Sequence, residues 1–349
     1  MAQPLSAAKL DQLVAPVALY PDPLLSQVLM ASTYPLEVVE AARWTRVQTS
    51  RALSREALVE ALKDKAWDPS VLSLVSFPRL LSLMVDKLEW TEQLGDAFLA
   101  QQDEVLDAVQ RLRQRALTTG NLRVTPQCHC VVRTSDETVS ILPAGARVIG
   151  VPIYDPAVAY GSWPDPLYPP IAFPPPTGFA AAAGAAVGFE SAVDLTAFGP
   201  LWGWSSIDWS HHSLAVDPAR YALAGKDHPA LADGIWVHNP AHRGAVGYAD
   251  AAVTARFDAA RIAAITRVGR AATTHPRVEA HSRGAAHSRA AGSHVWTRRH
   301  ARAFAPGTVI MPPPGYRRPP RQGPFSSPEF FADGPPPGYG APFPYGRYY

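Results

Sequence analysis

Apolar residues recur three or four positions apart through the first third of the chain, which is the spacing of one face of a helix. Between Leu10 and Trp44 this pattern is interrupted at Pro16, Pro23 and Pro35. A proline in the first turn of a helix loses no hydrogen bond, whereas inside a helix its ring clashes with the preceding turn. The stretch therefore predicts three short helices that turn sharply, with the carboxylate of Asp22 capping the second.

A weaker copy of the same pattern follows. Each copy contains an Asp-Pro pair, an aromatic-Pro pair and a tryptophan. In the first copy these are Asp22-Pro23, Tyr34-Pro35 and Trp44, and in the second they are Asp68-Pro69, Phe77-Pro78 and Trp90. The spacing from the aspartate to the tryptophan is the same in both copies. One interpretation is a two-unit helical array with a groove. The other is a coincidence, or an old duplication that now only fills a core.

Two further helices have clear end signals. Ser54 is placed to cap one of them, and the last begins near Asp103 and stops at Gly120-Asn121. Beyond Leu122 the pattern changes to alternation, which is typical of strands. Residues 127–134, 138–142 and 147–154 are the expected strands, and they predict a small antiparallel sheet that rests on the helices.

The predicted fold class is mainly α with a small antiparallel β element, that is α+β. Because 36 prolines and 24 glycines are concentrated beyond Gly150, we expect only the first two-fifths of the chain to supply a stable interior. Five segments follow: a compact helical domain over 8–120, a small β element packed on it over 121–160, a Pro-rich linker and Ala/Gly stretch over 161–200, a partly ordered Trp/His segment over 201–260, and a largely disordered tail over 261–349 that is first basic and then Pro/Tyr-rich.

The end of the chain is basic, although the whole sequence carries a net charge of only +2. From Arg256 onward there are fourteen arginines, four carboxylates and no lysine, and residues 256–270 have the spacing of a short basic amphipathic helix. Such a tract attracts polyanions, among them nucleic acid and anionic lipid headgroups, and its recurring histidines can hold metal loosely. The PPPGY repeats beyond Met311 suit an aromatic-lined groove on a partner, or act as a spacer.

Cys128 and Cys130 are the only cysteines and are separated by His129. On a strand both side chains would point to one face, too cramped for an unstrained disulfide. Two thiolates and one histidine also fall short of a structural zinc site. We therefore predict two small buried thiols.

Four carboxylates of the helical region are candidates for a general acid and a general base in catalysis. They are Asp22, Glu37, Asp68 and Asp96. Capping accounts for the two Asp-Pro sites, and solvated helix faces account for the others. The sequence therefore predicts structural roles for all four.

The strongest candidate for chemistry is an aromatic and histidine-rich segment around the motifs DWSHHS and WVHNPAH. The candidate metal ligands are His211, His212, His238 and His242. The candidate ligand-binding residues are Trp202, Trp204, Trp209 and Trp236, whose faces could stack on sugar rings or on a partner's aromatic residues. Pro240 argues against a helix that carries both His238 and His242, and the glutamate of a zinc-protease motif is absent. A third interpretation is that the aromatic residues pack back on the helical domain.

The block LDQLVAPVALYPDPLLSQVLMASTYPLEVVEAARW, followed by WDPSVLSLVSFPRLL and WTEQLGDAFLAQQDEVLDAVQRLR, closely resembles a bacterial family known as domain of unknown function 3300. The resemblance extends to about Gly161 and continues more weakly from Trp202 to Asp250. It implies an exported protein of the periplasm or cell envelope, and it assigns no activity. Met1 to Leu5 resemble the first residues of a processed exported protein, so we expect that a leader was trimmed. No apolar run reaches membrane-spanning length.

The sequence thus favours an exported cell-envelope protein that is not an enzyme, holds no cofactor, and interacts with a protein or an envelope polymer. A metal-dependent envelope hydrolase that uses the Trp/His segment is one alternative. A polyanion binder, for example of nucleic acid, that uses the Arg/His-rich tail is another.

Overall fold

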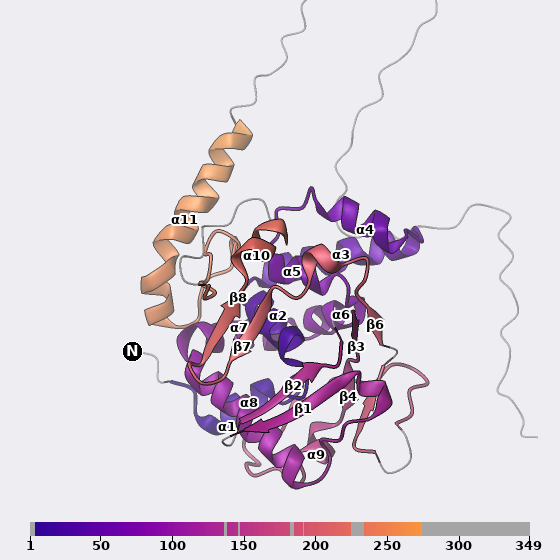
Figure 1. Cartoon of the computed structure of the whole chain (residues 1–349). Coiled ribbons are helices and arrows are strands. Elements are labelled where there is room, and N and C mark those ends of the chain that lie inside the picture. Colours follow the sequence, from indigo (N-terminus) through magenta and orange to yellow (C-terminus); the bar gives the residue numbers. More distant parts are fainter. Residues whose placement is uncertain are drawn as a thin grey trace, which may run out of the picture. The chain divides into compact units, whose positions relative to one another are not determined.

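Helices α1 to α8 make up most of the first third of the protein (Figure 1). Their bounds are Ala7–Val14, Asp22–Ser32, Pro35–Ser50, Arg55–Leu62, Pro69–Leu74, Pro78–Asp86, Leu88–Ala100 and Gln102–Thr118. The computed structural model describes residues 4–135, 138–145, 147–181, 185–190, 192–224 and 234–273. Within these residues, the predicted fold class of helices with small antiparallel β elements is confirmed.

The helix starts follow the capping residues of the sequence. The hydroxyl of Ser54 accepts the N–H of Ala57, and the carboxylate of Asp68 accepts the N–H of Ser70. The two aromatic-Pro pairs also start helices in the same way. Tyr34 has φ −124° and ψ 58°, and Phe77 has φ −121° and ψ 66°, each directly before the first helical proline.

The two copies of the sequence pattern pack against each other, α2 on α5 and α3 on α6. The correspondence has two limits. Trp44 lies in α3 whereas Trp90 lies in α7, so the equal spacing of the tryptophans has no structural counterpart. The predicted cap at Asp22 is also wrong, because Pro21 takes the N-cap position and the carboxylate of Asp22 lies inside the first turn.

Among the described residues, the strands form four separate antiparallel pairs rather than one sheet. The hairpin of β1 (Cys130–Ser135) and β2 (Thr138–Pro143) matches the prediction. The expected third strand is split into β3 (Val148–Ile149) and β4 (Pro152–Tyr154), which pair with β6 (Val193–Asp194) and β5 (Val187–Phe189). Gly150 lies between them, and a Cβ on it would overlap the backbone carbonyls of Gln127 and Cys128. The backbone at Gly150 therefore packs directly against residues 127–128 and does not add a third strand to the hairpin.

The hydrophobic core continues far beyond residue 160. The hairpin of β7 (Ser205–Asp208) and β8 (Ser213–Val216) packs on α2, and the same buried cluster includes Leu195, Trp204, Leu214 and Trp236. The expectation that only the first two-fifths of the chain supply the interior is therefore wrong. A few large aromatic side chains provide enough apolar area to compensate for the many prolines and glycines around them.

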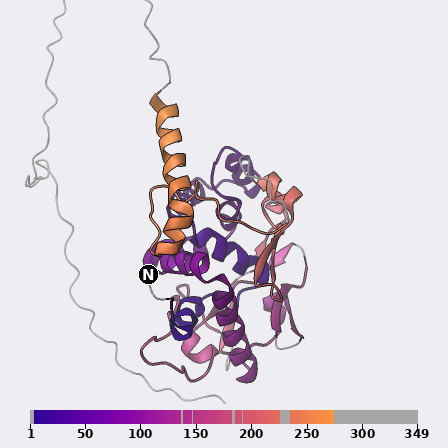
Figure 2. The same ribbon diagram turned by 90° about the vertical axis from the view of Figure 1, so that its left-hand side faces the viewer.

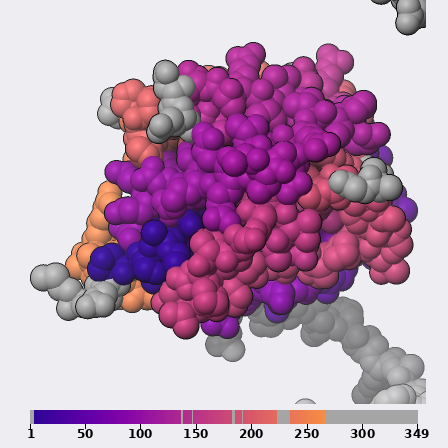
Figure 3. Space-filling view, turned by 90° about the horizontal axis from the view of Figure 1, so that it is seen from below, coloured from indigo at the N-terminus to yellow at the C-terminus, as the bar shows by residue number. Residues whose placement is uncertain are grey.

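The proline-rich segment that was expected to be a linker lies against the helices, as the view from below shows (Figure 3). Gln12 Nε2 donates to the carbonyl of Pro169 over 2.7 Å. Arg79 donates to the carbonyl of Pro174, and the ring of Phe173 meets Trp90 edge-on. An extended proline-rich chain keeps its carbonyls unpaired, so it offers acceptors to these side chains.

The remaining short elements are α9 (Pro156–Ala159), α10 (Pro218–Ala224) and the 3₁₀ turns Pro126–Cys128 and Gly199–Leu201. Helix α11 (Ala251–Thr273) confirms the helix predicted over 256–270 and extends away from the rest of the unit (Figure 2). In the described part of the chain, no helix combines the length and the apolar character needed to cross a membrane. The tail predicted over 261–349 begins inside α11, which includes residues 261–273, and the rest of that range lies outside the described residues.

Candidate functional site

Five polar or aromatic residues converge where the segment 234–248 crosses the start of α3. We call them the Glu37 cluster, and they are Tyr34, Glu37, Asp68, His238 and His242. Tyr34 and Glu37 lie at the N-cap and in the first turn of α3, and Asp68 caps α5. The two histidines come from a non-helical segment, and they follow Asp68 by at least 170 positions. The cluster thus joins the helical region to the Trp/His segment.

Glu37 is the centre of this cluster. Its Oε1 lies 2.7 Å from Nδ1 of His242, and its Oε2 accepts the backbone N–H of Asp68 over 2.7 Å. Burial raises the pKa of Glu37 to about 7, even though His242 and the Asp68 N–H both favour the ionised form. A carboxyl and an imidazole in contact, with the carboxyl titrating near neutrality, can take up or release a proton at physiological pH.

His238 is held in the neutral form. Its ring stacks on Tyr34 with centroids 5.1 Å apart, and its Nε2 lies 2.9 Å from the hydroxyl of Tyr248. Burial, with a further contribution from nearby Arg243, lowers the pKa of His238 to about 3. Its Nδ1 is buried and has no hydrogen-bond partner among the described residues.

Tyr34 and Asp68 complete the contacts of the cluster. The Tyr34 hydroxyl accepts the N–H of Asn239 over 3.0 Å, and burial raises the pKa of Tyr34 well above its usual value. One oxygen of Asp68 accepts both the N–H and the hydroxyl of Ser70, and the other lies 3.5 Å from the hydroxyl of Tyr221. Apart from Nδ1 of His238, the polar groups of the cluster described here thus contact other parts of the same chain.

A second carboxylate also binds the later segment. Asp96 of α7 pairs with Arg243 over 2.7 Å, and the Arg243 side chain is only 1% exposed. The same guanidinium donates to the carbonyls of Thr33 and Gly247. The expectation that Asp96 and Glu37 lie on solvated helix faces is therefore wrong, because both are covered by segment 234–248.

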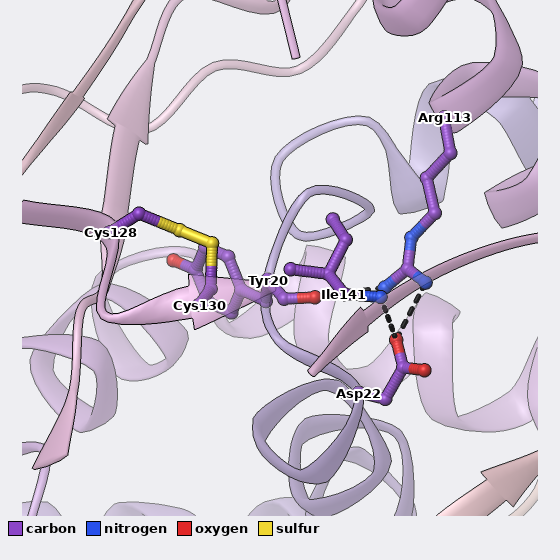
Figure 4. Close-up of a disulfide and its surroundings, with 6 residues drawn as sticks. All are labelled: Tyr20, Asp22, Arg113, Cys128, Cys130 and Ile141. Carbon is purple, nitrogen blue, oxygen red and sulfur yellow. Dashed lines mark hydrogen bonds and ion pairs between the residues drawn. A yellow bond between two sulfur atoms is a disulfide. The ribbon is translucent and has the colours of Figure 1, made fainter. Parts of the chain in front are cut away.

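Asp22 lies at a third junction, drawn in Figure 4. It accepts from Arg113 Nη1 over 2.6 Å, as the figure shows. It also accepts from Trp209 Nε1, which the figure does not draw, over 3.0 Å. Arg113 also donates to the carbonyls of Ala18, Tyr20 and Val139. This pair therefore ties the α1–α2 turn to α8, to β2 and to the aromatic segment.

The four candidate tryptophans belong to the interior of the fold and not to an open stacking surface. Trp202, Trp204 and Trp236 are 7%, 1% and 6% exposed, and Trp209 is partly buried. Trp204 donates to the hydroxyl of Ser73, and Trp202 lies against Phe77. Of the interpretations offered by the sequence, packing on the helical domain is the one that describes their position.

The four candidate histidines do not converge. His211 contacts Asp208 on the exposed tip of the β7–β8 hairpin, and His212 reaches Asp107 of α8. His238 and His242 lie apart from them, in the Glu37 cluster. Across the described ranges, no group of three or more His, Cys, Asp or Glu residues is placed to hold a metal ion.

Cys128 and Cys130 form a disulfide, so the prediction of two free thiols is wrong (Figure 4). The prediction assumed that both residues lie on one strand. Cys128 instead ends a 3₁₀ turn, and His129 adopts the left-handed conformation with φ 47° and ψ 35°. That reversal brings the two side chains together with a Cα–Cα distance of 5.0 Å, within the usual range for disulfides.

No sequence signal pointed to Glu37 and His242 as a pair, because 205 positions separate them. The buried role of Arg113, in contrast, could have been predicted from the sequence. Arg113 lies four residues after Val109 on the apolar face of α8, where a charged side chain requires a buried partner.

Comparison with known proteins gives a family but no activity. Residues 6–234 match the family described as protein of unknown function, DUF3300. The uncharacterized protein YacH of Escherichia coli strain K12 is 34% identical over 312 residues, which cover 72% of this chain and 50% of YacH. The chain thus spans about half the length of that relative. No solved structure matches it. On the family match and the identity to YacH, the chain belongs to the DUF3300 family.

Proposed function

We propose that this protein is an exported, non-enzymatic interaction protein of the cell envelope. In this proposal the folded unit up to α11 is a base, and the basic chain that follows contacts a protein or an envelope polymer. The observation that carries the proposal is the use of the candidate site residues inside the fold. Glu37, Asp96 and Asp22 each bind a basic residue of the same chain, and the aromatic residues fill its core.

The disulfide supports an exported location. Disulfides persist in the periplasm and at cell surfaces, whereas the cytosol keeps thiols reduced. Cys128 and Cys130 are 2% and 6% exposed and lie beside Ile141, so the bond is part of a packed region. A reduced pair would leave two thiols at this place and remove the link that holds the His129 turn.

The basic end of the chain supports an interaction role. Helix α11 is the last element among the described residues, and the sequence from 256 onward holds fourteen arginines against four carboxylates. A dense positive charge beside many prolines and glycines attracts acidic partners and does not supply a core of its own. In this proposal the base provides the folded structure, and the charged extension binds the partner.

Cell fractionation of the native gene product, with its own upstream sequence, tests the location. The expected result is recovery in the periplasmic or envelope fraction, with both cysteines resistant to alkylation until a reductant is added. A cytoplasmic protein with alkylatable cysteines would overturn the proposal. Turnover of an envelope substrate that is lost in His242→Gln, while the variant remains folded, would overturn its non-enzymatic part.

A further inference from the structure

Helix α11 is anchored to the folded unit through its first three turns. Asp250 caps its start by accepting the N–H groups of Ala252 and Val253. Val253 is 4% exposed, and the ring of Phe257 meets that of His238 edge-on with centroids 4.9 Å apart. One turn later, Arg261 donates to the carbonyl of Gly244 over 3.1 Å. The start of the helix is therefore fixed by segment 234–250.

The next turn presents apolar side chains to solvent. Ile262 is 50% exposed and Ile265 is 41% exposed. Nine residues separate Val253 from Ile262, which is two and a half helical turns, so Ile262 faces away from the buried side. Both views show that the end of α11 extends past the rest of the unit (Figures 1 and 2). An isoleucine pair with about half of its surface exposed is available to an external surface.

The charge around this pair is almost entirely positive. Within α11 there are four arginines, of which Arg261 and Arg267 flank the isoleucines in the sequence, and the one carboxylate is Asp258. Six more arginines and one glutamate follow up to Arg302. Isoleucine with arginine on either side is the composition of helices that lie in a lipid headgroup layer, where guanidinium groups bind phosphates and apolar side chains enter the acyl boundary.

We propose that α11 docks through Ile262 and Ile265 on an anionic phospholipid surface, to which the net positive charge of the helix attracts it. This proposal rests on the proposed envelope location, since it requires access to a membrane surface. Two other occupants satisfy only part of the site. A nucleic acid would pair the arginines but leave both isoleucines in water. A second copy of the chain would cover the isoleucines but bring two strongly positive segments together.

The test uses the full chain and vesicles in a sedimentation assay at about 0.1 M salt, where charges are screened beyond about one nanometre. We expect binding to vesicles of phosphatidylcholine mixed with phosphatidylglycerol, and little binding to phosphatidylcholine alone. The variant Ile262→Ser/Ile265→Ser should bind about tenfold more weakly, because two apolar side chains no longer enter the headgroup layer. A matched control is Val158→Ser/Leu167→Ser, which removes two side chains that are 54% and 83% exposed elsewhere, and should bind as the wild type does.

Four results would overturn the proposal. The first three are equal binding to neutral and anionic vesicles, unchanged binding of the isoleucine variant, and an assembly of two copies that this variant dissociates while vesicle binding persists. Binding to duplex DNA in place of vesicles would also overturn it. Thermal unfolding of each variant verifies that its fold is intact. If the protein is recovered in the envelope fraction but does not bind vesicles, only this inference is contradicted. If it binds vesicles but is recovered in the cytoplasm, the proposed location is contradicted.

Discussion

Arg113 of α8 and Asp22 of α2 form an ion pair that water barely reaches. Their side chains are 0% and 3% exposed, and Nη1 lies 2.6 Å from Oδ1. Trp209 stacks its ring on the same guanidinium, whose carbon lies 4.9 Å from the ring centroid, and donates its own N–H to Asp22. Three distant parts of the chain thus share one buried charge pair, and a change in either partner leaves the other charge uncompensated.

We therefore expect Asp22→Ala to destabilise the fold by about 3–5 kcal/mol, because the buried guanidinium loses its counter-charge. Urea unfolding followed by tryptophan fluorescence measures this. The matched control is Glu60→Ala, which breaks an exposed pair with Lys63 and should change the stability by less than about 1 kcal/mol. A similar decrease in the free energy of unfolding for both variants would show that the buried pair stabilises the fold no more than the exposed pair does.

His238 should make the fold sensitive to acid. Its pKa is lowered from 6.5 to about 3, so between these values the unfolded chain binds a proton that the folded chain does not. Stability from this residue is complete above pH 6.5 and falls as the pH drops towards 3. We expect His238→Phe to flatten the pH dependence of urea unfolding in this range. An unchanged pH profile in a folded variant would contradict the assignment.

Glu37 should act with the opposite sign. Its pKa is raised from 4.5 to about 7, so its contribution to stability is present below pH 4.5 and is lost as the pH rises through 7. The difference in unfolding free energy between the wild type and Glu37→Gln should therefore shift against the wild type between pH 5 and 8. His242→Gln is the companion variant, since it removes the imidazole and leaves the carboxyl. A difference that is constant with pH would refute the prediction.

Gly95 lies in the middle of α7, where alanine ordinarily stabilises a helix by about 1 kcal/mol. Here a Cβ would overlap the backbone carbonyl of Ser32 at the end of α2. We expect Gly95→Ala to lower the melting temperature, because neither backbone can yield without losing helix packing. Gly145→Ala is the control, since its Cβ would meet no atom within 4 Å. A stabilised Gly95→Ala protein would mean that α2 and α7 are not in such close contact.

The disulfide should matter less than the buried ion pair. A bridge between Cys128 and Cys130 closes a loop of three residues, for which loop-closure entropy amounts to about 1–2 kcal/mol. Cys128→Ala/Cys130→Ala should therefore remain folded at room temperature with a modest loss in urea stability. A loss as large as that of Asp22→Ala would assign the bond a greater role than its short loop allows.

The sequence predicted what is local. Ser54 and Asp68 cap helices because a short polar side chain is placed beside the first free N–H groups. The pairing of β1 with β2 follows from the alternation of apolar and polar residues along both strands. What failed was non-local. Asp22 was assigned to a cap although its partner is 91 residues away, and periodicity carries no information about such a contact. Trp204 was considered for ligand binding, because composition alone does not distinguish a buried tryptophan from an exposed one.

The way segment 234–248 is fastened to α3 and α7 has a practical consequence for anyone who wishes to produce this protein. A fragment that stops near residue 160, as composition would suggest, removes the basic partners of Glu37 and Asp96 and uncovers the surface on which Trp204 and Trp236 rest. Such a truncated product should aggregate on expression, whereas one that continues through Thr273 retains every described counterpart. The shortest useful recombinant fragment must therefore include the segment that covers Glu37 and Asp96, and not only the helices at the start of the chain.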